Sequence, residues 1–279
     1  MKNSIELKSK ASYLKYFILL LAFTLSGCED VIQVDLATGE DKIVIDAEIL
    51  WQKGTDGNMQ KIKISRMAAY YNPSVPKVSG AEVYISNSGG TQFTFIEVDE
   101  PGVYICTDFV PELNETYTLY VKVGEQVYTA IETMMPVSKI ERVEQKLIDD
   151  FGTEVVEVSF YFNDPENEAN FYIGQFVTDV IKYPEYELEE DEFFNGNEIR
   201  NDFSDEDLKP GKIVDITLRG VSEQFYNYMD LILDAVEPDA FSSPPANIRG
   251  NIVNQNGSGT FALGYFRLCE SDHISYVVE

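Results

Sequence analysis

The sequence predicts a mainly β protein, with an N-terminal immunoglobulin- or transthyretin-like β-sandwich and a second β-rich domain that contains one amphipathic helix. Short runs of β-branched and aromatic residues alternate with polar residues, which is the pattern of half-buried strands. Turn sequences rich in Gly, Asn and Pro separate these runs. A segment of helical period is absent from the sequence before residue 136.

The predicted sandwich spans residues 38–136. The run at 61–65 alternates strictly between polar and apolar side chains, so we expect one of its faces to be buried. The sequence NSGG at 87–90 predicts a hairpin turn, and Pro136 marks the exit from the domain. Seven strands are expected, at 42–50, 61–65, 81–86, 93–96, 102–106, 117–123 and 127–131.

The second domain is predicted at 137–279. Ser222 is expected to cap a helix whose apolar face runs from Phe225 to Ala235, and Pro238 to end it. Residues 182–212 mix carboxylates with aromatics without a clear period, so we expect a long connection between strands, a type of segment that is often functional. Strands are expected at 155–162, 171–181, 213–218, 261–266 and 274–278.

The first residues have the order of a bacterial lipoprotein signal. Lysines precede an apolar run at 16–25, which ends in the sequence LSGC at Cys28. The run is shorter than the roughly 20 residues that a membrane-spanning helix needs. We therefore expect removal of residues 1–27, lipidation of Cys28 and an acidic tether at 28–37. An ordinary secretory signal or a buried strand is the alternative.

The composition excludes one large class of function. The formal net charge is −27, and a chain this acidic repels nucleic acid, whose phosphates are bound by Lys and Arg. The 17 Tyr and 17 Phe nevertheless supply a hydrophobic core that disordered acidic chains lack. We therefore expect a folded protein that binds no nucleic acid.

Two cysteines remain once Cys28 carries lipid. Cys106 and Cys269 are far apart in the sequence, and an exported compartment permits a disulfide between them. The alternative is two separately buried thiols, which behave as small hydrophobic groups. Spacing alone does not decide between them.

Two surfaces are candidates for contact with a partner or ligand. Within the segment 182–212, aromatic side chains of the kind enriched at interfaces stand at Tyr183, Tyr186, Phe193 and Phe194. Arg249 lies between two prolines and Gly250, and its guanidinium suits a partner carboxylate. A purely structural turn around Arg249 is the favoured alternative, because Asn and Gly dominate turns.

Acidic residues in the same segment are a weak calcium candidate. Asp202, Asp205 and Asp207 supply the hard oxygen ligands that Ca²⁺ takes, but their spacing does not match an EF-hand loop. A solvated acidic loop is the favoured alternative. No other cofactor is expected.

Catalysis is not expected. His273 is the single histidine, and a Ser-His-Asp or Cys-His mechanism would depend on it. Asp272 is only its neighbour in sequence, so we interpret His273 as a surface or strand-end residue. A glycoside hydrolase needs only two carboxylates, but no motif marks such a pair.

Several motifs in a fixed order resemble a known family. These are CED at 28–30, KIVID at 42–46, VSGAEV at 78–83, GVY at 102–104, ETYTL at 115–119, PPANIRGNI at 244–252 and LGYF at 263–266. Together they resemble the Bacteroidetes lipoproteins grouped as domain of unknown function 4249. The family has no assigned catalytic residues to carry over.

The resemblance implies a location and a partner. Its members are outer-membrane lipoproteins, often encoded beside TonB-dependent transporters, and Glu29 and Asp30 after the lipidated cysteine resemble a surface-export signal. We therefore expect a lipid-anchored protein that faces the cell exterior and captures a small nutrient ligand for, or covers, such a barrel. A structural adhesin or envelope assembly scaffold is the alternative, and a carbohydrate-active hydrolase is the third.

Overall fold

The computed structural model describes residues 42–68, 74–150, 152–166, 168–190, 196–236, 248–257 and 261–279. Fifteen strands and one helix lie within these ranges. The strands are β1 (Ile43–Gln52), β2 (Gln60–Arg66), β3 (Glu82–Asn87), β4 (Gln92–Glu97), β5 (Val103–Cys106), β6 (Thr116–Val123), β7 (Gln126–Thr133), β8 (Ile140–Asp150), β9 (Thr153–Asn163), β10 (Phe171–Val177), β11 (Glu185–Glu190), β12 (Glu198–Asp205), β13 (Ile213–Val221), β14 (Val253–Asn254) and β15 (Leu263–Val277), and the helix is α2 (Glu223–Val236).

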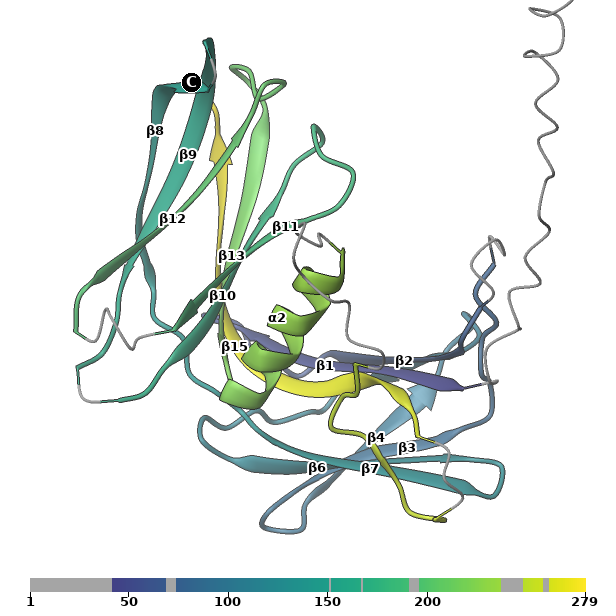
Figure 1. Ribbon diagram of the computed structural model, residues 1–279. Coiled ribbons are helices and arrows are strands. Elements are labelled where there is room, and N and C mark those ends of the chain that lie inside the picture. The colour runs from purple at the N-terminus through teal and green to yellow at the C-terminus, as the bar shows by residue number, and fades with distance from the viewer. Residues whose placement is uncertain are drawn as a thin grey trace, which may run out of the picture. The chain divides into compact units, whose positions relative to one another are not determined.

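The protein is mainly β with sandwich-like sheets, as the sequence predicts (Figure 1). One sheet has the strand order β11-β10-β13-β15-β1-β2-β5-β4-β3-β6-β7-β14, and the other has the order β12-β9-β8. All seven strands expected before residue 136 are present. Their apolar side chains alternate inward, as in β1, where Ile45, Ala47 and Ile49 are buried between half-exposed neighbours.

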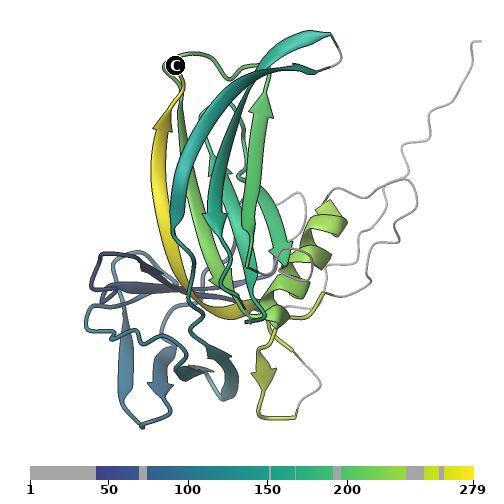
Figure 2. The same ribbon diagram turned by 90° about the vertical axis from the view of Figure 1, so that its left-hand side faces the viewer.

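Strand β15 joins the two halves of the chain (Figures 1 and 2). Residues 263–271 pair in parallel with β1, and residues 271–277 pair antiparallel with β13. The sequence predicts two separate closing strands here, which is wrong, because residues 267–273 continue the ladder between them. Gly264 permits the close approach to β1: its φ is 91°, and a Cβ there would lie 2.1 Å from the carbonyl oxygen of Ile45.

Two large hydrophobic clusters form the core. The first lies mainly between β1, β2 and β5 on one side and β3, β6 and β7 on the other, with Phe266 and Leu268 of β15 contributing. The second lies between β8, β9 and β12 and the sheet formed by β10 and β13. The boundary predicted at residue 136 does not separate these clusters in sequence, because Phe266 and Leu268 belong to the first, and the division into two domains stays a prediction.

The prediction of a long connection at 182–212 is wrong. Residues 185–190 and 198–205 form β11 and β12, which extend the two facing sheets. In β12 the side chains of Ile199, Asn201 and Phe203 are buried and alternate with exposed polar ones. Pairing with β10 and β9 therefore outweighs the weak strand propensity of these acid-rich sequences.

Helix α2 is found where the sequence predicts it. The Ser222 hydroxyl accepts a hydrogen bond from the Phe225 amide at 3.2 Å, as an N-cap does. Phe225 is the buried member of its apolar face and packs with Ile173, Val221 and Tyr265 in a third, smaller cluster. Pro238 lies outside the described residues.

Candidate ligand-binding site

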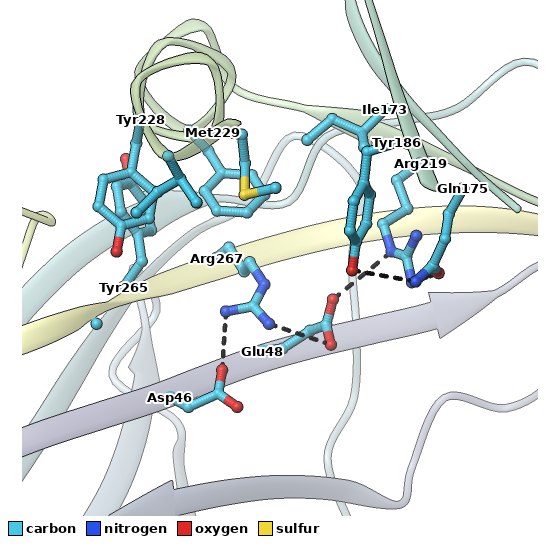
Figure 3. A pocket seen from close by; sticks show the side chains of 13 residues that line it. Asp46, Glu48, Ile173, Gln175, Tyr186, Arg219, Tyr228, Met229, Tyr265 and Arg267 are labelled. Atoms are coloured by element: carbon cyan, nitrogen blue, oxygen red, sulfur yellow. Dashed lines mark hydrogen bonds and ion pairs between the residues drawn. The ribbon is translucent and has the colours of Figure 1, made fainter. Parts of the chain in front are cut away.

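A cavity of about 380 Å³ lies where α2 covers the strands around β15 (Figure 3). Its floor comes from neighbouring strands of one sheet and its opposite wall from the helix. The lining residues are Asp46, Glu48, Ile173, Gln175, Tyr186, Arg219, Phe225, Tyr228, Met229, Ile232, Gly264, Tyr265 and Arg267. The volume is in the lower part of the roughly 300–1,000 Å³ that small-molecule sites have.

The parallel pairing of β1 and β15 places an arginine between two carboxylates. Arg267 stands opposite Glu48 in the register, and Asp46 lies one pleat away on the same face of β1. Arg267 Nη1 is 2.9 Å from Asp46 Oδ1, and Nη2 is 3.3 Å from Glu48 Oε2. Nearby carboxylates raise the pKa of Arg267, against the opposing effect of burial, so it carries its charge within the site.

The polar groups continue across the next three strands. Arg219 of β13 lies 3.6 Å through Nε from Glu48 Oε1 and donates through Nη2 to Gln175 Oε1 at 2.8 Å. Gln175 of β10 donates in turn to the hydroxyl of Tyr186 on β11 at 3.2 Å. Together these residues form what we call the polar row: Asp46, Arg267, Glu48, Arg219, Gln175 and Tyr186 (Figure 3).

Arg219 has one nitrogen without a partner. Its Nη1 is buried and makes no hydrogen bond among the described residues. A buried donor left unpaired costs free energy, so this atom is an unsatisfied polar group beside the cavity.

An aromatic wall faces the polar row. It consists of Phe225 and Tyr228 of α2 and Tyr265 of β15, with centroid separations from Tyr265 of 4.9 Å to Phe225 and 4.8 Å to Tyr228. Arg267 lies 5.4 Å from the Phe225 centroid, which joins the wall to the row. The cavity therefore has one polar and one aromatic side.

A buried carboxyl, that of Glu132, contacts both the helix cap and the aromatic wall. Glu132 of β7 accepts a hydrogen bond from the Ser222 hydroxyl at 3.0 Å, and the Tyr265 hydroxyl lies 3.5 Å from the same oxygen. Burial raises the pKa of Glu132 above its ordinary value, although these hydrogen bonds and one from the Thr133 amide oppose that shift. Glu132, in the first half of the chain, is therefore a common partner of the N-cap residue Ser222 and of Tyr265 in the wall.

The predicted contact residues are not brought together. Tyr186 lines the cavity, but Tyr183 is 71% exposed and is not among its lining residues. Phe193 and Phe194 lie outside the described residues. The guanidinium of Arg249 stacks on Phe261 at 4.1 Å, while Asn251 exchanges two hydrogen bonds with the backbone of Phe266, and a partner contact of Arg249 stays a prediction.

The two cysteines are free thiols, so the disulfide alternative is wrong in this structure. Cys106 belongs to the first core cluster and Cys269 to the cluster beside α2. Both are buried, and each is held among hydrophobic neighbours of its own cluster, which is the second alternative that the sequence left open.

The structure does not bring together the three carboxylates of the calcium candidate. Asp202 lies 3.2 Å from Arg200, and Asp205 accepts a hydrogen bond from the backbone of Asp207, so the three carboxylates do not converge. Across the described part of the chain, no group of three or more His, Cys, Asp or Glu side chains is placed to hold a metal ion. The strand pleat of β12 explains this, because it separates Asp202 from the turn that follows.

His273 lies on the exposed face of β15 in a polar cluster. Its Nδ1 is 3.1 Å from Thr217 Oγ1, whereas Ser275 and Asp215 both lie on the side of Nε2, at 3.5 and 3.8 Å. A hydrolytic triad places the carboxylate on Nδ1 and the serine on Nε2, so this order differs from a triad. Asp272 instead accepts a hydrogen bond from the Ile140 amide at 2.7 Å.

The sequence-based analysis missed most of the polar row. Asp46, Glu48, Arg219 and Arg267 each occupy an outward position in a strand whose other face is buried. The available signal was the charge on alternate positions of β1, with one arginine in each of β13 and β15 between buried apolar or small neighbours. Their convergence depends on the pairing of β1 with β15, which the local sequence does not encode.

Cys28, predicted to carry lipid, and Glu29 and Asp30, predicted as an export signal, lie outside the described residues. The helices described in the structure include none that is both long and apolar enough to cross a membrane.

Comparison with solved structures finds partial similarity to two fibronectin type III domains of chicken tenascin, at 15% identity over 58% of this chain and 83% of that one, with a TM-score of 0.21. The FN1–FN3 domains of chicken CNTN1 match at 14% identity over 63% of this chain and 62% of that one, with a TM-score of 0.24. A DUF4785 family protein of Legionella pneumophila matches at 12% identity over 64% and 50%, with a TM-score of 0.23. No curated protein matches the chain. Residues 29–275 match the family described as domain of unknown function (DUF4249), and the chain therefore belongs to that family.

Proposed function

We propose that this protein is a non-enzymatic outer-membrane lipoprotein of Bacteroidetes that captures a small nutrient ligand for a TonB-dependent barrel. The cavity between the polar row and the aromatic wall is the observation that carries the proposal. A lid needs only a surface that fits the barrel, whereas capture needs a concave site with a few convergent polar groups. The cavity therefore favours capture over a role as a lid alone.

The anchoring half of the proposal rests on the sequence. Cys28 follows a lipoprotein-type signal, and Glu29 and Asp30 resemble a surface-export signal. A net charge of −27 favours a body that stays in solution at the end of its lipid tether and is repelled by anionic head groups.

Affinity purification tests the partnership. The tagged full chain is extracted from membranes of its native host in mild detergent, and the proteins recovered with it are quantified by mass spectrometry. We expect one outer-membrane barrel in stoichiometric amount. Cys28→Ser, which removes the lipidated thiol, is the matched control and is expected to leave the membrane fraction and lose the barrel.

Two results would contradict the proposal. Recovery of the lipoprotein alone, in detergent that keeps other barrel complexes intact, would favour a free-standing scaffold. An unchanged membrane location of Cys28→Ser would remove the lipid anchor from the proposal.

A further inference from the structure

The charges of the polar row balance one another inside the cavity. Asp46 and Glu48 contribute two carboxylates, and Arg219 and Arg267 contribute two guanidinium groups. Each arginine lies within 4 Å of a carboxylate, and Glu48 is shared between both arginines. The cavity thus holds charged groups without a net charge.

A balanced row disfavours an ionic ligand. An ion that enters the cavity loses its hydration, and this cost is recovered only where an unpaired opposite charge receives it. All four charged side chains already have a counter-charge, and the net charge of −27 further opposes an anion.

A neutral ligand with hydroxyl groups gains from the same row. Hydrogen bonds to charged partners are stronger than those between neutral groups, and a hydroxyl both donates and accepts. It can donate to a carboxylate such as Asp46, whose side chain is 47% exposed. Gln175 and the Tyr186 hydroxyl extend this set without adding charge.

The aromatic wall requires a second property of the ligand. Phe225 and Tyr265 are buried and Tyr228 is half-buried, so Tyr228 is the ring of the wall that can cover an apolar group while the row satisfies polar ones. A sugar ring has C–H groups on its faces and hydroxyls around its rim, which matches both sides of the cavity. We infer that the cavity binds a neutral saccharide; this inference rests on the proposed capture function and names its ligand class.

Saturation-transfer NMR and titration calorimetry on the folded lipid-free chain test this class. The probes are cellobiose, maltose, xylobiose and N,N′-diacetylchitobiose, with glucuronic acid, glucosamine and the dipeptide Tyr-Gly as charged comparisons. We expect binding of at least one neutral disaccharide, with the strongest saturation transfer to the C–H protons of one ring face. Charged probes are expected to bind about tenfold more weakly or worse.

Two variants test the site itself. Tyr228→Ala is expected to weaken saccharide binding about tenfold or more. Tyr84→Ala is the control, because Tyr84 belongs to β3 and does not line the cavity, and it is expected to leave binding unchanged. Glu48→Gln keeps the side-chain shape and leaves the row with a net positive charge. It is therefore expected to improve binding of glucuronic acid relative to the neutral disaccharide, and Glu82→Gln is its control.

The inference is overturned if no neutral disaccharide binds, if a charged probe binds more tightly than all of them, or if Tyr228→Ala binds like the unchanged protein. These outcomes differ from failure of the proposed function. If the chain recovers the barrel but binds no saccharide, the partnership is supported and the saccharide inference is overturned. If it binds saccharide but recovers no barrel, the saccharide inference is supported and the partnership is contradicted.

Discussion

At the scale of single residues, the cysteines give a direct test of burial. Burial raises the pKa of the Cys106 thiol to about 11 and that of Cys269 to about 12, so neither forms the reactive thiolate at neutral pH. We expect both thiols of a lipid-free chain that lacks Cys28 to resist a thiol reagent such as DTNB in the native state and to react fully in guanidinium chloride. Absence of reactive thiols after unfolding would instead show a disulfide.

Glu132 predicts how stability depends on pH. Its folded-state pKa lies above the unfolded value because of burial, so its stabilising contribution is complete below the unfolded pKa and is lost as the pH rises through the folded pKa. Glu132→Gln removes this titration; its one amide oxygen can still accept from the Thr133 amide, and its NH2 group can donate to the Ser222 hydroxyl oxygen. We therefore expect the melting temperature of Glu132→Gln, relative to the unchanged protein, to increase as the pH rises from acidic to neutral.

Glu97 is the control, because its shift has the opposite sign. Hydrogen bonds from the amides of Gly102 and Gly80 lower the pKa of this exposed carboxyl. Its contribution is present above the unfolded pKa and is lost as the pH falls through the folded pKa. Glu97→Gln should therefore be less stable than the unchanged protein at neutral pH, and this difference should close in acid. Parallel pH profiles for the two variants would contradict both assignments.

At the scale of elements, local pattern predicts some strands much better than others. The first seven strands and α2 follow from alternation, turn sequences and the Ser222 cap. Strands β8, β11 and β12 were missed because their sequences are rich in acidic and exposed residues, and their pairing with β9 and β10 fixes them. The same limit applied to the polar row, since Arg267 and Glu48 meet only through a non-local pairing.

Gly264 tests that non-local pairing. An added Cβ would lie 2.1 Å from the Ile45 carbonyl oxygen, and the positive φ strains any side chain in addition. We expect Gly264→Ala to reduce the free energy of unfolding by more than the roughly 1–3 kcal/mol typical of a strained backbone position. Urea denaturation followed by circular dichroism measures this change.

Gly90 separates the two causes. It also has a positive φ, of 82°, but no atom lies within 4 Å of its ideal Cβ position. Gly90→Ala should therefore show the cost of the backbone conformation alone. Equal losses at the two glycines would mean that the close approach of β15 to β1 contributes nothing to stability.

At the scale of the whole molecule, β15 predicts how the chain unfolds. Residues 39–279 form one compact unit, and β15 contributes Phe266 to the first core cluster while its end pairs with β13 in the second half. We expect differential scanning calorimetry to show one cooperative transition, with the calorimetric enthalpy equal to the van't Hoff enthalpy. Two resolved transitions would support independent domains on either side of residue 136.

The same strand constrains when the fold can be completed. Asp46 and Arg267 meet in the cavity although they are 221 residues apart in the sequence. A chain that is synthesised from its N-terminus therefore presents β1 long before its parallel partner is made. Contacts of this separation form slowly, because the loop between them must first be closed. The cavity is consequently one of the last features to form, and the candidate site stays incomplete until β15 has paired with β1.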